Sequence, residues 1–116
     1  MSEGSSPHII NTTTATFEKD VVQRSMDCPV VVDFWSTGCE PCRQLTPMLE
    51  KLAEEFAGKF VLVKVNVDES PEIAEAFGVQ SIPVVVALFQ GQPVNQFTGL
   101  LPEPKLREWL QTFLPS

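Results

Sequence analysis

Apolar and polar residues follow one another along this chain in blocks that predict strands and helices in turn. A short apolar segment at residues 8–10 predicts a strand, and apolar side chains recur at helical spacing over residues 17–22. The threonines at residues 12–14 are candidate N-caps for that helix. The run Val30–Trp35 is β-branched and aromatic, typical of a strand buried on both faces, and one acid, Asp33, interrupts it.

The middle of the chain predicts a helix, a strand and a second helix. Apolar residues recur every three or four positions over residues 45–56, and Gly58 ends the pattern. Pro47 falls inside this segment, so we expect a kink in the helix. A strand is predicted over residues 60–67, and a short helix that begins with a proline is predicted over residues 71–77.

The last part of the chain predicts an antiparallel hairpin and a final helix. The strands are expected at residues 84–89 and 94–97, with a turn at residues 90–92. Pro102 is expected to begin the last helix, which carries its apolar positions over residues 106–113. The element order is then β-α-β-α-β-α-β-β-α, which predicts an α/β fold with a central mixed sheet and helices on both faces.

Length, composition and charge narrow the class of protein. A chain of 116 residues with 43% hydrophobic and 20% charged residues is typical of one globular domain, which we expect over residues 8–114 after a flexible tail at residues 1–7. The net charge of −7 argues against a nucleic-acid or anionic-membrane partner, because such partners require clustered Lys and Arg. The N-terminus lacks the pattern of a secretory signal, and the longest apolar run, at residues 84–89, is too short to cross a bilayer. We therefore expect a soluble, cytoplasmic monomer.

Two of the three cysteines, Cys39 and Cys42, have CxxC spacing where a buried strand leads into a helix. Cys39 is expected at the helix N-terminus, where unpaired N–H groups and the helix dipole favour a thiolate by ~0.3–1 kcal/mol. It is then the exposed attacking sulfur, and Cys42, shielded in the first helical turn, resolves the mixed disulfide. Pro41 suits that turn because its missing N–H has no partner there.

The other interpretation of a CxxC pair is one half of a zinc site. A structural zinc ion requires a second pair of ligands, and the remaining soft ligands, Cys28 and His8, are not spaced as one. The alternation of strands and helices favours redox chemistry. Cys28 is expected to be a small, half-buried apolar residue rather than a regulatory thiol.

From about residue 8 to residue 114 the chain resembles the thioredoxin family. The family pattern of a strand, a WCGPC motif, a basic residue and a kinking proline is similar to residues 33–35, 39–43 and 47 of this chain. Further matches, in the family order, are Lys64, Ser81-Ile82-Pro83, Gly91 and Gly99. The resemblance implies the thioredoxin fold and a Cys39/Cys42 dithiol that reduces disulfides in substrate proteins. It also implies a thioredoxin-reductase-type electron donor and no metal or organic cofactor.

The resemblance further implies a substrate-binding segment opposite the cysteines. The Ile82–Pro83 bond is expected to be cis and to face the cysteine pair, with the Ile82 backbone pairing to an extended substrate peptide and Gly99 beside it. Sequence alone favours a trans bond, because X–Pro bonds in folded proteins are cis in only about 5–6% of cases. Trp35 is expected to pack beside the active-site helix.

A buried acid in an apolar strand is either a structural cap or a functional group, and the resemblance favours the second for Asp33. It implies that Asp33 acts through water as the base that deprotonates Cys42, with Lys64 nearby to tune its charge. Taken by itself, Lys64 is more simply interpreted as a solvated surface lysine.

Two positions beside the cysteines differ from the family pattern. Gly38 stands where the family has Trp, which removes apolar contact area for a substrate protein, and Glu40 replaces a Gly and adds a negative charge beside Cys39. Both are expected to alter the substrate-docking surface. They leave open an alternative function as the docking or holdase domain of a chaperone-type protein. The segment from residue 100 onward resembles the first domain of thioredoxin-like proteins that continue into helical repeats and can act as holdases. A disulfide oxidant or isomerase is a further possibility.

Overall fold

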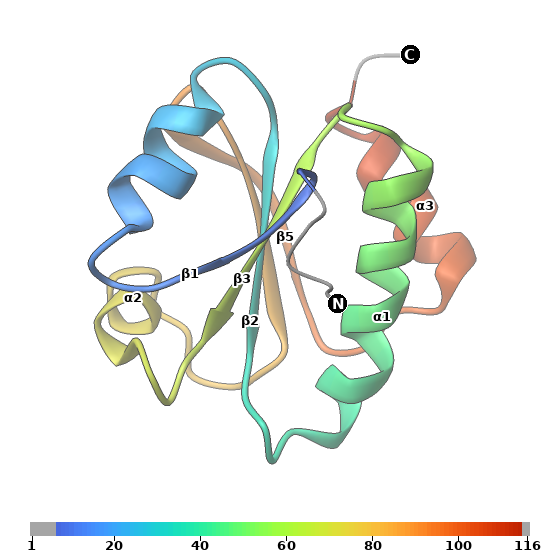
Figure 1. Ribbon diagram of the computed structural model, residues 1–116. Coiled ribbons are helices and arrows are strands. Elements are labelled where there is room, and N and C mark those ends of the chain that lie inside the picture. Colours follow the sequence, from blue (N-terminus) through green and yellow to red (C-terminus); the bar gives the residue numbers. More distant parts are fainter. Residues whose placement is uncertain (1–6, 115–116) are drawn as a thin grey trace.

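The computed structural model describes residues 7–114, so the predicted tail at residues 1–7 lies outside the described residues except for Pro7. The chain forms a central sheet between two pairs of helices (Figure 1), which is the α/β architecture that the sequence pattern predicts. The elements are β1 (Ile9–Thr12), η2 (Glu18–Gln23), β2 (Val30–Trp35), α1 (Glu40–Glu55), β3 (Val61–Asn66), α2 (Pro71–Ala76), β4 (Val84–Phe89), β5 (Gln92–Thr98) and α3 (Glu103–Gln111).

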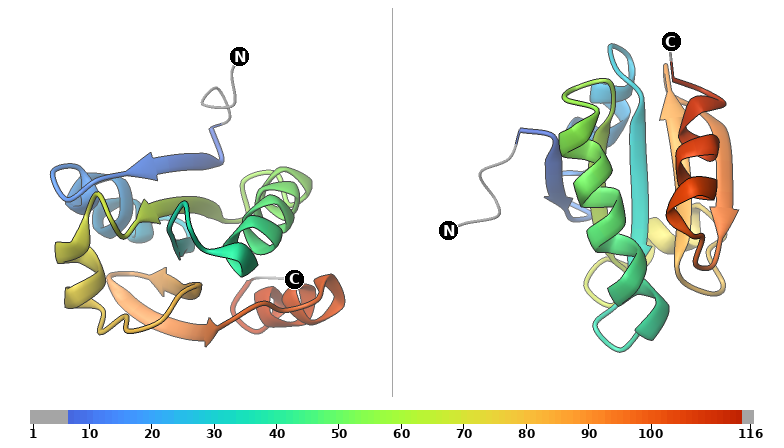
Figure 2. Two further views of the ribbon diagram at one scale, coloured as in Figure 1. Left: turned by 90° about the horizontal axis from the view of Figure 1, so that it is seen from below. Right: turned by 90° about the vertical axis from the view of Figure 1, so that its right-hand side faces the viewer.

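The sheet is mixed, with the strand order β1-β3-β2-β4-β5. Strands β1 and β2 both run parallel to β3, whereas β4 runs antiparallel to β2 and β5 antiparallel to β4. Helices α1 and α3 cover one face, and η2 and α2 cover the other, as the view from below in Figure 2 shows. The central strand β2 leads directly to the loop before α1, which puts the start of that helix at the carboxyl end of the sheet.

Strand β2 contributes side chains to two separate cores because successive residues point to opposite faces of a sheet. Val31 packs in the core beneath α1 and α3. Val30, Val32 and Phe34 pack in the core on the η2 and α2 face. Asp33 shares the parity of Val31, so its carboxyl group is directed toward α1.

The first helix differs from the prediction. It is a π-helix, η2, whose N-cap residue Phe17 has no side-chain capping hydrogen bond, so the prediction of a threonine cap is wrong. The Thr12 hydroxyl is instead used across the turn after β1, where it donates to Asp20 Oδ2 at 3.0 Å and lies 3.0 Å from the Thr16 hydroxyl. Side chains that bridge the turn in this way are no longer available to the first helical N–H groups.

Two boundaries near the C-terminus also differ from the prediction. The hairpin turn consists of Gln90 and Gly91 alone, with φ angles of 53° and 77°, so β5 already begins at Gln92. Pro102 keeps an extended backbone (φ −67°, ψ 156°) and is the N-cap of α3 rather than its first helical residue. These differences lie in turns and caps, where local backbone geometry decides the boundary.

Candidate active site

Cys39 and Cys42 form a disulfide at the first turn of α1, with an S–S distance of 2.10 Å and Cα atoms 5.3 Å apart. Cys39 is the N-cap of α1, and its Sγ accepts a hydrogen bond from the Cys42 N–H at 3.2 Å. That N–H has no acceptor within the helix, and the helix dipole favours negative charge at the same place. The position therefore stabilises a Cys39 thiolate when the disulfide is reduced.

The two cysteines are both largely buried, with 8% of Cys39 and 2% of Cys42 exposed. The expectation that Cys39 is exposed is wrong for this disulfide form, because the bond to Cys42 holds its sulfur against the helix N-terminus. Cys39 is still the more accessible of the two cysteines. This agrees with their roles, because the attacking sulfur must reach a substrate and the resolving sulfur need only reach Cys39.

Asp33 lies buried beneath α1. Its Oδ2 accepts a hydrogen bond from the Thr46 hydroxyl at 2.6 Å, and its Oδ1 has no partner among the described residues. Burial raises the pKa of Asp33 to about 6, against the lowering effect of the Thr46 hydrogen bond and of the Lys64 charge. Asp33 can therefore change its protonation state close to neutral pH.

Lys64 lies on β3 at the position paired with Asp33 in the β2–β3 register. Its ammonium group binds the Glu50 carboxylate of α1 at 2.6 Å, and only 13% of the lysine side chain is exposed. The interpretation as a solvated surface lysine is therefore wrong, because α1 covers this part of β3. Lys64 lies near Asp33, as the resemblance implied, but it is ion-paired with Glu50.

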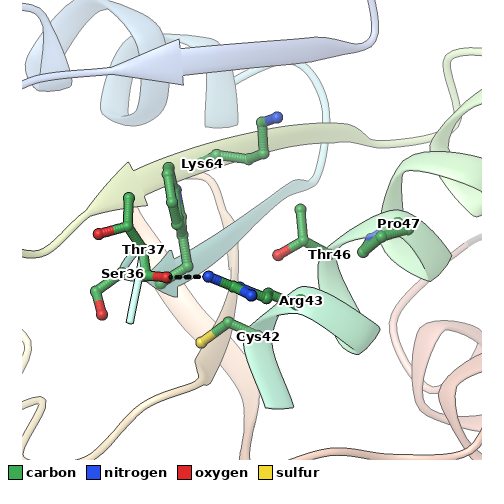
Figure 3. A pocket seen from close by; sticks show the side chains of 8 residues that line it. Ser36, Thr37, Cys42, Arg43, Thr46, Pro47 and Lys64 are labelled. Carbon is green, nitrogen blue, oxygen red and sulfur yellow. Dashed lines mark hydrogen bonds between the residues drawn. The ribbon is translucent and has the colours of Figure 1, made fainter. Parts of the chain in front are cut away.

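A pocket of about 390 Å³ opens beside the first two turns of α1 (Figure 3). Cys42 and Thr46 reach it from the helix, and Lys64 reaches it from β3. The remaining lining residues are Trp35, Ser36, Thr37, Arg43 and Pro47. Because its volume exceeds that of several water molecules and its lining includes hydroxyl and ammonium groups, water can approach both Cys42 and the neighbours of Asp33.

The Ile82–Pro83 peptide bond is cis, as the resemblance implied. The first residue of β4, which follows this bond, pairs with Phe34 near the end of β2, so the bond lies at the end of the sheet where the loop to α1 leaves. The Gly99 N–H donates to the Pro83 carbonyl at 2.8 Å. Three of the five predicted substrate-binding residues, Ile82, Pro83 and Gly99, are thus brought together at the end of the sheet where α1 begins.

The residues that flank the cysteines are exposed. A Cβ atom added to Gly38 would meet no atom within 4 Å, so this side of the disulfide is open to solvent. The Glu40 carboxylate lies 3.9 Å from the Arg43 guanidinium, with both side chains mostly exposed. Pro41 stands in the first turn of α1, as predicted, and Trp35 is half-buried beside the helix.

The family model described as Thioredoxin matches residues 8–112. The chain belongs to the thioredoxin family. Among curated relatives of this thioredoxin domain, thioredoxin 1 of Nostoc sp. is 38% identical over 102 residues, which are 88% of this chain and 94% of that protein. The thioredoxin of Rickettsia bellii is 39% identical over 100 residues, 86% of this chain and 93% of that protein.

Some relatives of the thioredoxin domain are longer proteins. An uncharacterized protein of Mycobacterium tuberculosis is 45% identical over 104 residues, which cover 90% of this chain but only 34% of that protein. The chain thus spans about a third of the length of such relatives. Membership of the family together with the Cys39–Cys42 disulfide makes the domain a thiol–disulfide oxidoreductase.

Two residues of the thioredoxin site, Thr46 and Glu50, were missed by sequence reasoning. They hold the side chains of Asp33 and Lys64 respectively. The available signal was their spacing of four and eight residues after Cys42, which places all three on one face of the helix.

Cys28 is half-buried and lies in the loop before β2. Burial raises the pKa of its thiol, which disfavours the nucleophilic thiolate form. In residues 7–114, no group of three or more His, Cys, Asp or Glu side chains is placed to hold a metal ion. Within the same residues, no helix has the length and apolar composition that crossing a membrane requires.

Proposed function

We propose that this thioredoxin domain is a protein-disulfide reductase in which Cys39 is the nucleophile and Cys42 the resolving thiol. The observation that carries the proposal is the Cys39 Sγ at the α1 N-cap, where it accepts the Cys42 N–H. A thiolate held there is stabilised by the helix N-terminus, and the thiolate is the form that attacks a disulfide.

The proposed reaction has two exchange steps. The Cys39 thiolate attacks one sulfur of the substrate disulfide, forms a mixed disulfide and expels the other substrate sulfur as a thiolate. Cys42 then loses its proton and attacks the Cys39 sulfur, which forms the Cys39–Cys42 disulfide and releases the second substrate sulfur as a thiolate. The substrate gains two electrons, and the domain loses them.

Asp33 is the proposed base for the second step. Its Oδ1 has no hydrogen-bond partner among the described residues, and water in the neighbouring pocket is proposed to carry the proton from Cys42 to Asp33. A pKa of about 6 leaves most of Asp33 ionised at neutral pH, so it can accept that proton. The proton then returns to solvent or to the departing substrate sulfur.

Substrate proteins are proposed to bind at the end of the sheet where α1 begins. An extended peptide pairs there with the Ile82 backbone beside Pro83 and Gly99, and it passes the exposed residues Gly38 and Glu40. Supporting positions are Trp35, Pro41 and Lys64, which shape the pocket and the first helical turn.

The reducing direction is supported by two observations. Relatives of nearly the same length are thioredoxins. Glu40 also adds negative charge next to Cys39, which disfavours the reduced thiolate form and so favours electron donation, although exposure weakens this effect. We propose a thioredoxin-reductase-type donor, a cytoplasmic location and a monomeric state for the domain. The holdase alternative is supported by no observation on the described residues or in the comparisons.

The test is turnover of insulin disulfides by the reduced protein in the presence of dithiothreitol. Cys39→Ser should lower the rate to background because it removes the nucleophile. Reduced Cys42→Ser, freed of dithiothreitol and then mixed with insulin, should accumulate a covalent mixed disulfide on Cys39 because no second thiol resolves it. Cys28→Ser is the matched control and should keep the wild-type rate. Equal background rates for the wild type and Cys39→Ser would overturn the proposal, as would a folded Cys42→Ser protein that traps no substrate.

A further inference from the structure

Three polar residues form a row along one face of α1. Cys42, Thr46 and Glu50 are spaced four residues apart, so their side chains lie above one another on the helix. Two of the three make hydrogen bonds to the sheet beneath: Thr46 bonds to Asp33 of β2, and Glu50 bonds to Lys64 of β3. The row therefore begins at the resolving cysteine and continues over the buried acid and its lysine neighbour.

The two sheet residues beneath the row are direct neighbours. Asp33 and Lys64 are partners in the parallel β2–β3 register, so opposite charges stand on adjacent strands. Their side chains nevertheless bind the helix and not each other in the hydrogen bonds and ion pairs of the described residues. The Thr46 hydroxyl donates a hydrogen bond to Asp33 Oδ2 at 2.6 Å, and the Lys64 ammonium donates one to Glu50 Oε2 at 2.6 Å.

We propose that Thr46 and Glu50 are positioning residues that control, in opposite directions, when Asp33 gains and loses its proton. The Thr46 hydroxyl donates to the carboxylate and stabilises its charged form. Glu50 neutralises the Lys64 charge that would otherwise stabilise the same form, and it adds a negative charge of its own. This inference rests on the proposed function, because it gives Asp33 the role of base for Cys42.

The groups around Asp33 come from three elements. Helix α1 contributes Cys42, Thr46 and Glu50, and β3 contributes Lys64. Strand β4 presents Val85 opposite Asp33, which is apolar and buried. The charges facing Asp33 are thus those of Lys64 and Glu50, and both influence the pKa of Asp33, the first by lowering it and the second by raising it.

The proposal predicts that removing the two side-chain groups shifts the titration midpoint of Asp33 in opposite directions. Thr46→Val keeps the shape of the side chain but removes the hydroxyl donor, so Asp33 should titrate about one pH unit higher, as expected for losing a hydrogen bond to a charged group. Glu50→Gln removes the carboxylate and leaves Lys64 free to stabilise the ionised acid, so Asp33 should titrate roughly half a pH unit lower. Thr46→Ser keeps the hydroxyl and should restore the wild-type midpoint.

The measurement is a carbon-13 NMR titration of the Asp33 carboxyl carbon in the reduced protein, together with the pH profile of mixed-disulfide resolution by Cys42. The matched control is Glu75→Gln, which removes an exposed carboxylate from α2 and should move neither midpoint. Opposite shifts in Thr46→Val and Glu50→Gln, with rescue by Thr46→Ser, support the proposal. Midpoints within about 0.2 pH units of wild type in both variants overturn it. Shifts of the same sign also overturn it, because Thr46 is proposed to stabilise the ionised form of Asp33 and Glu50 to destabilise it.

The two readouts separate this inference from the proposed function. If the Asp33 midpoint moves up in Thr46→Val and down in Glu50→Gln, and the pH profile of resolution moves with it, the positioning role and the proposed function are both supported. If the NMR midpoint moves but the resolution rate does not follow, the positioning role of Thr46 and Glu50 is supported, and the role of Asp33 as the base for Cys42 is overturned.

Discussion

A carboxylate buried without full hydrogen bonding should lower the stability of this domain at neutral pH, and Asp33→Asn tests this directly. Asn has nearly the same shape as Asp but carries no charge at any pH. The substitution therefore removes the cost of burying an ionised group, whereas its own packing cost stays the same across the pH range.

The magnitude follows from the pKa of Asp33, which burial raises from 3.8 to about 6. Between these two values the folded protein binds a proton at Asp33 that the unfolded chain does not, so wild-type stability falls as pH rises through this window. The full cost is present above pH 6 and absent below pH 3.8. A shift of roughly two units at ~1.4 kcal/mol per unit gives about 3 kcal/mol.

The assay is urea unfolding of the oxidised protein, followed by tryptophan fluorescence from pH 3 to pH 8. The free energy of unfolding of Asp33→Asn, minus that of the wild type, should rise by about 3 kcal/mol over this range. Asp27→Asn serves as the control, since Asp27 is exposed and loses little hydration on folding. A difference that stays flat with pH, or that falls as pH rises, would refute the reasoning.

Two further predictions concern the core and the end of α1. Leu49 belongs to α1 and is fully buried in the core between this helix and the sheet, so Leu49→Ala should lower the free energy of unfolding by about 2–5 kcal/mol in urea titrations. A loss below about 1 kcal/mol would contradict this packing. Ala57 follows α1 with φ 46°, where a Cβ atom is strained, so Ala57→Gly should raise the melting temperature by stabilising the fold by about 1 kcal/mol. A lower melting temperature for Ala57→Gly would show that the flexibility gained by the unfolded chain outweighs the strain relieved.

Much of the fold could be predicted because its signals are local. The period of the apolar residues predicted each strand and helix, and Gly, Pro and charge marked most of their ends. The first helix was predicted less well: it is π-helical and has no side-chain cap, and the Thr12 hydroxyl bonds across the preceding turn to Asp20. No periodicity in the sequence reports such a contact.

The candidate site was predictable to different degrees. Cys39 and Cys42 were identified by their spacing and by the strand-to-helix junction, and the structure joins them at the N-cap of α1. The cis bond before Pro83 needed the family resemblance, because cis bonds are rare among X–Pro bonds. The exposure of Cys39 was predicted wrongly, since the sequence does not show that the disulfide holds the Cys39 sulfur against the N-terminus of α1.

By itself the sequence determined the order of elements, the redox pair and the presence of an acid inside a buried strand. All three follow from residue types at short range. Only the tertiary structure decided that Thr46 binds Asp33 and that Glu50 binds Lys64. Those contacts depend on the register of β2 against β3 and on which face of α1 lies on the sheet, and both are set by packing between segments far apart in the chain.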